Sequence, residues 1–573
     1  MLEKFLPRQE FDSYEDFKAN YRVITPPRFN FAYDVVDEWA RLDDAKPALA
    51  WMNNAMQERV FTFGEVSRLS NQAANLFTAH GIRKGDRVLL ILKQRPEVWI
   101  CMVALHKIGA VVIPASFQFK RHDLVYRFQA ADVKLVACVD LPDVLAEVEA
   151  AAAECPGVRE IMVVGDQVPK GRFDFRRELA AFPQEWAVPQ GDAYPCLNDP
   201  MLMYFTSGTS GMPKMIIHDY TLPLGHIVTA KYWQQVQDGT RHMTAADSGW
   251  AKFAWGKIYG QWCCGAVIAA YDYDGHFSAH QFLTAIMSLK LSTFCAPPTI
   301  YRFLIKENLA EYDFSGLKQC SIAGEPLNPE VYNQWMAQTG LPLVEGFGQT
   351  ETSVLIANFP WFPVKPGSTG KFAPIYDLQI LDDNQKPCED GIVGHVVIRH
   401  AKSQRPVGLF REYYHSPEAM AASWPDDDYY TGDMAWRDED GYIWFMGRND
   451  DVIKCSGYRI GPFEVESALM EHPAVLECAV TAYPDAIRGE CVKATIVLNK
   501  KAGREPSPEL VRELQQLVKK ITAPYKYPRI VEFVEELPKT TSGKILRTEI
   551  RKRDLAKLKQ AREAQGGDAS LGK

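Results

Sequence analysis

Residues 202–214 read LMYFTSGTSGMPK, an apolar run followed by a loop of serine, threonine and glycine that ends at Lys214. Such a loop lets successive backbone N–H groups and hydroxyls face a polyphosphate, and a lysine adds a positive charge to it. Pro213 stands directly before the lysine, so the stretch differs from the Walker pattern GxxxxGK[ST]. It predicts a strand leading into a phosphate-binding loop. Taken alone, the stretch is also compatible with a flexible Gly/Ser turn.

On both sides of this stretch, short apolar runs alternate with helical stretches. The runs include DRVLLIL, VVIP and VKLVACVD before it, and AVIAAY, STFCAPP and KQCSIAG after it. This alternation predicts parallel strands joined by crossover helices, which is the α/β class. Residues 361–400 are rich in proline and glycine and predict an additional subdomain of short β-strands.

A polar GRNDD stretch interrupts the pattern after GYIWFMGR. The residues that follow predict a separate α+β lobe of roughly one hundred residues, within the usual size range of a domain. We therefore expect a large amino-terminal domain over residues 1–449 and a small mobile carboxyl-terminal domain over residues 450–565. The last residues, 566–573, are expected to be a disordered tail.

Composition excludes several classes of function. With 72 acidic against 64 basic residues and a net charge of -8, the chain lacks the broad cationic surface that nucleic-acid binding needs. No segment reaches the ~20 apolar residues that would span a bilayer. The first residues, MLEKFLPRQEFDSYEDFKANYR, contain no long apolar run and carry several acids, so a cytoplasmic protein is expected. Twelve scattered cysteines without metal-ligand spacing indicate reduced thiols.

Further polar islands follow the phosphate-binding stretch in a fixed order. They are GEP at 324–326, EGFGQTE at 345–351, YTGD ending at Asp433, GRNDDVIKCSGYRI at 447–460 and PKTTSGK ending at Lys544. In this order the set resembles the adenylate-forming superfamily of acyl-CoA synthetases, adenylation domains and luciferases, over residues 40 to 555. The stretches SGYRIGPFEVESALMEHPAV, RGECVKA, TAPYKYPR and LPKTTSGKILR are most similar to the medium-chain acyl-CoA synthetases.

The resemblance implies a reaction and its cofactors. ATP and a medium-chain or branched carboxylic acid would give an acyl-adenylate and pyrophosphate, and coenzyme A would then release AMP and form the thioester. Mg²⁺ would accompany ATP. The alternatives are a short-chain or aromatic acid CoA ligase, an adenylating enzyme that loads a carrier protein, and a non-catalytic nucleotide-binding regulator. The oligomeric state stays open, a homodimer included.

Roles at the nucleotide follow from the same resemblance. It assigns ATP binding to Thr206, Ser207, Gly208, Thr209, Ser210, Gly211, Lys214, Gly324, Glu325, Pro326, Glu345, Gly346, Phe347, Gly348, Gln349, Thr350, Asp433, Arg448 and Arg459. Glu351 would help to hold Mg²⁺, which prefers carboxylate and phosphate oxygens. Asp433 would accept both ribose hydroxyls. Lys544 is the expected catalytic residue, because displacement at phosphorus depends on positioning and on cations that offset developing charge.

The thioester step implies a second site. In this family the carboxyl-terminal lobe rotates, and Asp450 matches the hinge position, where a few residues absorb the change in backbone dihedrals. The rotated lobe would bind CoA through Ser456, Gly457, Tyr458, Arg488, Tyr527, Pro528 and Arg529. The arginines among them suit the phosphates of the CoA nucleotide.

The acyl pocket is expected between the EGFGQTE segment and the stretch DSGWAKFAWGK, with Trp250, Lys252, Trp255 and Gly348 as its boundary. Acetate-specific relatives place a tryptophan immediately before QTE, where this chain has Gly348. The absence of an indole there predicts room for a longer or branched acid. The PxFHxxG pattern of luciferases and aryl-CoA ligases is absent. Ordinary core packing is the alternative role for both tryptophans.

Overall fold

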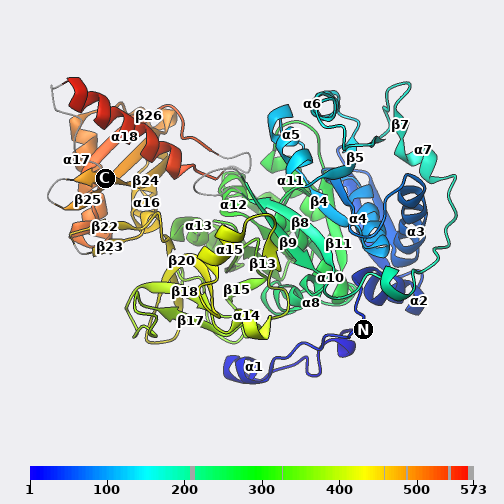
Figure 1. The fold of residues 1–573 in the computed structure, drawn as a ribbon. Coiled ribbons are helices and arrows are strands. Elements are labelled where there is room, and N and C mark those ends of the chain that lie inside the picture. Colours follow the sequence, from blue (N-terminus) through cyan, green and yellow to red (C-terminus); the bar gives the residue numbers. More distant parts are fainter. Residues whose placement is uncertain (207–212, 326, 457, 486–487, 540–543, 565–573) are drawn as a thin grey trace.

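The computed structural model describes residues 1–206, 213–325, 327–456, 458–485, 488–539 and 544–564. Four β-sheets organise these residues (Figure 1). The amino-terminal segment contains α1 (Tyr14–Asn20) and α2 (Glu38–Leu42). It also contains a short 3₁₀-helix at Leu2–Lys4 and a π-helical turn at Ala32–Asp37. None of the described helices combines the length and the apolar character needed to cross a bilayer.

An eight-stranded sheet carries the phosphate-binding stretch. Its order is β19-β9-β8-β4-β3-β5-β6-β7, with parallel pairing from β8 through β7. The strands are β3 (Arg87–Ile91), β4 (Val111–Pro114), β5 (Val133–Val139), β6 (Glu160–Val164), β7 (Phe173–Asp174), β8 (Pro200–Thr206), β9 (Lys214–Asp219) and β19 (Glu412–Tyr413). The connections contain α3 (Phe63–Ala79), α4 (Glu97–Ile108), α5 (Arg121–Ala130), α6 (Pro142–Ala152) and α7 (Phe175–Leu179).

Local sequence explains where these crossover helices begin and end. Thr62 and Glu65 form a reciprocal capping box at the start of α3. Gly109 ends α4 in the left-handed conformation, with φ of 83°, which glycine adopts without a Cβ clash. All twelve residues of α4 are buried, because it is enclosed between the sheet and its neighbouring helices.

A nine-stranded sheet lies beside the first, in the order β16-β15-β14-β13-β12-β10-β11-β1-β2. Its strands are β1 (Pro47–Asn53), β2 (Glu58–Thr62), β10 (Arg241–Thr244), β11 (Val267–Asp272), β12 (Thr293–Ala296), β13 (Gln319–Ile322), β14 (Leu343–Gly348), β15 (Val354–Ala357) and β16 (Lys371–Phe372). Its helices are α8 (Leu222–Gly225), α9 (Ala251–Gly256), α10 (Tyr259–Cys263), α11 (Ala279–Ser288), α12 (Pro298–Leu304) and α13 (Pro329–Thr339). The GEP segment follows the carboxyl end of β13, and β14 itself contains EGFG, so neighbouring parallel strands bring these motifs together.

The third sheet forms a β subdomain that extends to Arg448, beyond the residues 361–400 expected from the sequence, and its four antiparallel strands have the order β17-β18-β20-β21. They are β17 (Leu378–Leu381), β18 (Gly394–Ile398), β20 (Tyr429–Arg437) and β21 (Ile443–Arg448), accompanied by α14 (Ala401–Gln404) and α15 (Pro417–Ser423). Asp433 and Arg448 are register partners on β20 and β21. Two residues expected at the nucleotide therefore lie side by side because of strand pairing.

The fourth sheet and its helices stand to one side of the rest, orange to red in Figure 1. The strands are β22 (Ile453–Cys455), β23 (Tyr458–Ile460), β24 (Val475–Asp485), β25 (Gly489–Leu498) and β26 (Ile530–Val534), and the helices are α16 (Pro462–Met470), α17 (Pro508–Ile521) and α18 (Arg547–Ala564). Leu510, Leu514 and Val518 recur every four residues on one face of α17 and are buried in this lobe's own core. The mixed α/β fold class expected from the sequence is confirmed.

Candidate active site

The β8–β9 hairpin holds the two ends of the phosphate-binding stretch together. Thr206 and Lys214 are register partners at its tip. Tyr126 Oη donates a 2.9 Å hydrogen bond to the carbonyl of Pro213, which fixes the backbone just before the lysine. Lys214 Nζ lies 4.8 Å from the centroid of the Tyr413 ring. The expected ligands Ser207, Gly208, Thr209, Ser210 and Gly211 lie outside the described residues.

Glu351 lies next to this hairpin. Tyr413 Oη donates a 2.8 Å hydrogen bond to Glu351 Oε1, so one tyrosine contacts both the carboxylate and Lys214. Burial raises the pKa of Glu351, while the Tyr413 hydrogen bond and the charges of Arg448 and Lys214 lower it. A single buried carboxylate near a phosphate-binding loop is a donor set that fits Mg²⁺, which takes most of its other ligands from phosphate and water.

Asp433 forms the centre of a polar cluster. Gln349 Nε2 donates to Asp433 Oδ2 at 2.5 Å and to the carbonyl of Thr431 at 2.7 Å. Arg448 Nη1 lies 3.6 Å from Asp433 Oδ1 and donates to the same carbonyl at 2.8 Å. The Asp433 side chain is only 4% exposed, and burial raises its pKa to about 6 despite the nearby Arg448. The cluster presents a fixed, buried carboxyl that suits a pair of hydroxyls.

Lys544 approaches this cluster from the other lobe. Its positive charge contributes to the pKa of Asp433, after burial, Arg448, Gln349 and Glu351. It also contributes to the lowered pKa of Lys252, which burial dominates. The tertiary structure therefore brings Lys544, on the lobe that begins beyond Asp450, close to side chains of the nucleotide site more than one hundred residues earlier in the chain.

The GEP segment lies beside Lys252. Lys252 Nζ donates a hydrogen bond to the carbonyl of Ala323, and a Cβ on Gly324 would lie 2.9 Å from that nitrogen. Gly324 also has a φ of 100°, which favours glycine. The Lys252 ammonium thus binds the main chain just before GEP, and its assignment to the acyl pocket stays a prediction.

The Glu325 side chain faces away from this backbone. Its carboxylate accepts a 2.9 Å hydrogen bond from Thr299 Oγ1 and pairs with Arg302 at 3.4 Å, both on α12. The Glu325 carboxylate is thus engaged by α12, and the assignment of Glu325 to ATP binding stays a prediction. Pro326 lies outside the described residues.

Three residues of strand β14 contact neighbouring parts of the chain. The Glu345 carboxyl is buried and accepts from the backbone N–H of Leu327 at 3.4 Å, and burial raises its pKa to about 8. A Cβ on Gly346 would lie 2.3 Å from Trp233. Phe347 packs on Phe445, with ring centroids 5.0 Å apart. Glycine at 346 is required by this close approach.

Thr350 is anchored by its main chain. Its carbonyl lies 2.7 Å from Nε2 of His218, a buried histidine of β9. Burial lowers the pKa of His218 to about 4, so its imidazole is neutral at physiological pH and Nε2 donates to the carbonyl. This bond links the EGFGQTE segment to the hairpin that carries Lys214.

The expected free space at Gly348 is filled. A Cβ at this position would lie 2.2 Å from Cη2 of Trp255 and 2.5 Å from the carbonyl oxygen of Ser353. Trp255, on α9, places its indole ring where a side chain at position 348 would lie, and this tryptophan is 8% exposed. Trp255 and Gly348, both expected at the acyl boundary, therefore lie in contact, and the room for a longer or branched acid stays a prediction. Trp250 lies further away against Phe119, with ring centroids 6.2 Å apart.

The residues expected to bind CoA gather on the carboxyl-terminal lobe. The backbone N–H of Ser456 donates to the carbonyl of Arg488 at 3.3 Å. Tyr458 is 51% exposed and stacks on Tyr525 at 4.0 Å. The remaining members form a neighbouring run: the Arg529 guanidinium donates to Tyr527 Oη at 2.8 Å, and the Pro528 carbonyl accepts from Gln515 at 2.9 Å. Gly457 lies outside the described residues.

Two further expected residues lie between the lobes. Asp450 Oδ1 is 3.9 Å from Nε of Arg448, directly after the last strand of the β subdomain. Arg459 donates to Asp383 Oδ2 at 2.5 Å and to the carbonyl of Val393 at 3.2 Å. The structure thus places the Arg459 guanidinium against the β subdomain, and its assignment to nucleotide oxygens stays a prediction.

Three contributors were not anticipated from the sequence. Tyr413 joins Glu351 to Lys214, Tyr429 Oη donates to Gln349 Oε1 at 2.8 Å, and Asp383 pairs with Arg459. Both tyrosines lie more than sixty residues from their partners and outside the motifs, in segments rich in ordinary aromatic residues. No local pattern marks them, because strand pairing in two different sheets creates the contacts.

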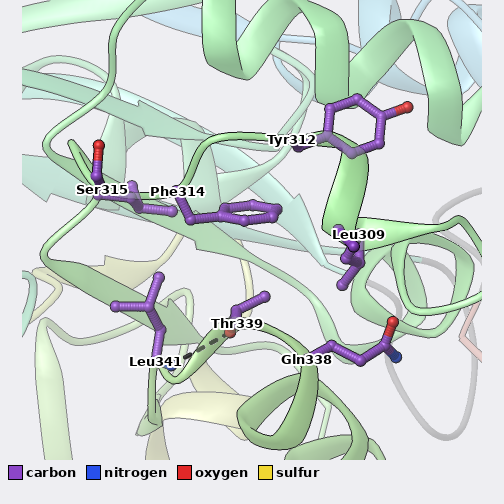
Figure 2. A pocket seen from close by; sticks show the side chains of 9 residues that line it. Leu309, Tyr312, Phe314, Ser315, Gln338, Thr339 and Leu341 are labelled. Atoms are coloured by element: carbon purple, nitrogen blue, oxygen red, sulfur yellow. Dashed lines mark hydrogen bonds between the residues drawn. The ribbon is translucent and has the colours of Figure 1, made fainter.

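Two hollows in the described part of the chain contain none of the expected site residues. One, of about 370 Å³, is lined by Leu309, Tyr312, Phe314 and Leu341 with Ser315, Gln338 and Thr339 at its edge (Figure 2). The other, of about 400 Å³, lies between Val344, Phe359, Phe362 and Tyr332. Neither lining includes a charged residue that could bind a phosphate.

Comparison with known proteins agrees with this geometry. A family model described as AMP-binding enzyme matches residues 36–414, and the model of the AMP-binding enzyme C-terminal domain matches residues 464–544. The chain belongs to the AMP-binding enzyme family. The expected superfamily is thereby confirmed.

This AMP-binding enzyme is 41% identical over 558 residues to the mitochondrial acyl-coenzyme A synthetase ACSM3 of Mus musculus, covering 95% of this chain and 94% of the relative. It is 42% identical over 543 residues to the mitochondrial acyl-coenzyme A synthetase ACSM5 of Homo sapiens, covering 94% and 92%. The crystal structure of the anthranilate CoA ligase AuaEII in complex with anthranoyl-AMP matches with a TM-score of 0.83 and 28% identity, covering 94% of this chain and 99% of that chain.

Proposed function

We propose that this AMP-binding enzyme is an acyl-CoA synthetase that converts ATP, a medium-chain or branched carboxylic acid and CoA into acyl-CoA, AMP and pyrophosphate. The proximity of Lys544 to the cluster of Asp433, Gln349 and Arg448 carries this proposal. A cation delivered by a second lobe onto a nucleotide site suits adenylate formation, in which negative charge develops at the α-phosphate. Similarity to acyl-coenzyme A synthetases over nearly the whole chain supports the same reaction.

In the first half-reaction a carboxylate oxygen attacks the α-phosphorus of ATP. The new acyl–O–P bond forms as the bond from that phosphorus to the bridging oxygen breaks, and the electron pair leaves with pyrophosphate. Asp433 would hold the ribose, Lys214 the outer phosphates, and Lys544 would offset charge at the α-phosphate and the substrate carboxylate. Mg²⁺ held by Glu351 would neutralise phosphate charge when bound.

In the second half-reaction the CoA sulfur attacks the acyl carbonyl, the acyl–O bond breaks, AMP leaves, and the thiol proton passes to solvent. For this step we assign residues 450–565 as a mobile lobe that turns about Asp450 against residues 1–449. Exposed Tyr458, with Arg488 and the Tyr527–Arg529 run, would then meet CoA, since guanidinium groups suit its phosphates. CoA, and not a carrier protein, is the proposed acceptor for this reason.

A short-chain or aromatic acid is the second candidate substrate. Trp255 occupies the space above Gly348, which favours a shallow pocket or a flat acid that stacks on an indole. The structural similarity to an anthranilate CoA ligase is consistent with this alternative. The two candidates differ only in the acid, so one experiment separates them.

The experiment is a panel of acids from acetate to decanoate, with 2-methyl-branched, benzoic and anthranilic acids, assayed for AMP release in the presence and absence of CoA. Maximal CoA-dependent AMP release with acids of six to ten carbons would support the main proposal. A preference for benzoate or acetate would support the second candidate, a short-chain or aromatic acid. AMP release only with an added carrier protein would contradict the CoA assignment.

The cellular compartment needs a separate experiment. The named relatives are mitochondrial, whereas the amino-terminal residues favoured the cytoplasm. Fractionation of cells expressing the tagged chain would decide between the two compartments.

A further inference from the structure

An ion pair joins the two lobes through residues other than those of the nucleotide cluster. Arg459 is on β23, nine residues beyond the proposed hinge, and Asp383 is in the turn between β17 and β18. Arg459 Nη2 donates to Asp383 Oδ2 at 2.5 Å, and Nη1 donates to the Val393 carbonyl on the same side of the β subdomain. His395 Nε2 lies 3.1 Å from the other carboxylate oxygen. The guanidinium is thus held by two groups of the opposite lobe.

The same lobe orientation brings Lys544 to the nucleotide site. Lys544 affects the pKa of both Asp433 and Lys252, which belong to the other lobe. In this orientation Tyr458, the direct neighbour of Arg459, is exposed and stacks on Tyr525. Arg459 of the hairpin β22–β23 therefore contacts the β subdomain, while Tyr458, a proposed CoA-binding residue, is exposed to solvent.

We propose that Asp383 and Arg459 form a positioning pair that holds the carboxyl-terminal lobe in the adenylate-forming orientation and opens for the thioester step. The inference rests on the proposed two-step reaction and extends it. Since the two residues belong to different lobes, a turn about Asp450 must separate them. The pair therefore stabilises one orientation and not the other, and so shifts the balance between the two.

The expected strength of the pair is modest. The Asp383 side chain is 65% exposed and that of Arg459 27%, so solvent screens the interaction. A pair of this kind shifts a two-state balance by about two- to fivefold, which is small enough to open in each cycle. Placing two like charges at these positions would add repulsion and shift the balance about tenfold.

The test separates the half-reactions. Acyl-adenylate formation is measured by pyrophosphate release without CoA, and thioester formation by adding CoA to enzyme loaded with synthetic acyl-adenylate. Asp383→Asn should slow the first rate about two- to fivefold and leave the second unchanged or faster. Asp383→Arg, which places two positive charges at these positions, should slow the first rate about tenfold and leave the second unchanged or faster.

A matched control lies in the same β subdomain. Arg437 and Asp390 form a 2.6 Å ion pair with half-exposed side chains, but both belong to one lobe. Asp390→Asn should leave both rates unchanged. Equal losses in both half-reactions, or no effect of Asp383→Asn and Asp383→Arg, would each overturn the positioning role. A wild-type enzyme that forms no acyl-CoA from any acid would instead refute the proposed function.

Discussion

The nucleotide cluster and the proposed CoA-binding surface are built in opposite ways. Asp433 is buried, and Gln349, Arg448 and Tyr429 fix its surroundings with short hydrogen bonds across two strands and a neighbouring segment. Tyr458 and Arg529, by contrast, lie on the surface of a separate lobe with aromatic and backbone contacts inside that lobe. Adenylate formation needs a preorganised, water-poor site, whereas the thiol must enter from outside. The polar cluster of the first site is therefore fixed within one lobe and receives Lys544 from the other, whereas the proposed CoA site requires the lobe to move.

Removal of the Lys544 charge should separate the two regions most strongly. Lys544→Ala is expected to slow acyl-adenylate formation by ~10² to 10³, the usual cost of losing a preorganised charged group. Thioester formation from synthetic acyl-adenylate should be nearly unchanged, because the lysine acts in only one orientation. Lys539→Ala, which removes a lysine paired with Glu477 on the same lobe, is the control. Equal losses in both assays would show that Lys544 does not act specifically in acyl-adenylate formation.

The hinge tests whether assembly by movement is required. Asp450→Pro fixes φ near -65° and restricts the preceding residue, so the chain should be confined to one lobe orientation. One half-reaction should persist and the other should fall by at least an order of magnitude, measured with the two separate assays. Asp450→Ala keeps the backbone freedom and loses only the 3.9 Å contact with Arg448, so it should retain most overall turnover. Full turnover by the proline variant would move the hinge elsewhere.

We expect Trp255 to determine which acids the acyl pocket accepts. Gly348→Ala should lower activity with every acid, because its Cβ would contact both Trp255 and the Ser353 carbonyl, and such overpacking costs about 1 to 3 kcal/mol. Trp255→Leu should instead raise the relative kcat/KM for longer acids by several-fold per methylene, since each buried methylene contributes ~0.8 kcal/mol. An unchanged chain-length profile in Trp255→Leu, measured from acetate to decanoate, would remove Trp255 from the acyl pocket.

Burial of Asp433 predicts a pH dependence that the exposed CoA surface should lack. With a pKa of about 6, Asp433 takes up a proton as pH falls below 6 and loses its capacity to accept two ribose hydroxyls. The kcat/KM for ATP should fall about tenfold per pH unit below 6, and the constant for CoA should change less. Because the pKa of Asp433 is raised in the folded state, protonation of Asp433 stabilises the folded protein at low pH. This contribution to the free energy of unfolding is lost as pH rises through about 6. The pH profiles are measured by AMP release between pH 5 and 8.

Burial raises the pKa of Glu351 as well. Asp433→Asn identifies which carboxyl is responsible. This variant should bind ATP weakly at every pH and show a flatter profile below pH 6. A profile as steep as that of the wild type would assign the pH dependence to Glu351.

The smallest effect is expected at Tyr413. Tyr413→Phe removes the 2.8 Å hydrogen bond to Glu351 but keeps the ring near Lys214, so the loss should be about 0.5 to 1.5 kcal/mol. The apparent affinity for Mg²⁺ and ATP should weaken two- to tenfold, measured by AMP release at varied Mg²⁺. Tyr414→Phe, at the half-buried neighbouring position, should change neither constant. Equal effects of the two substitutions would show that the hydroxyl of Tyr413 does not support Glu351.

The amino-acid sequence by itself determined the α/β class, the order of the motifs and the family, because strands and phosphate-binding loops are encoded in short local patterns. It also indicated the separate lobe, since the polar GRNDD stretch interrupts the alternation. The contacts of Tyr413 with Glu351, of Trp255 with Gly348 and of Arg459 with Asp383 were decided only by the tertiary structure. Each joins segments 62 to 93 residues apart, counted as 413 − 351, 348 − 255 and 459 − 383. Strand pairing, helix packing and the meeting of two lobes create such neighbours, and no local pattern specifies them.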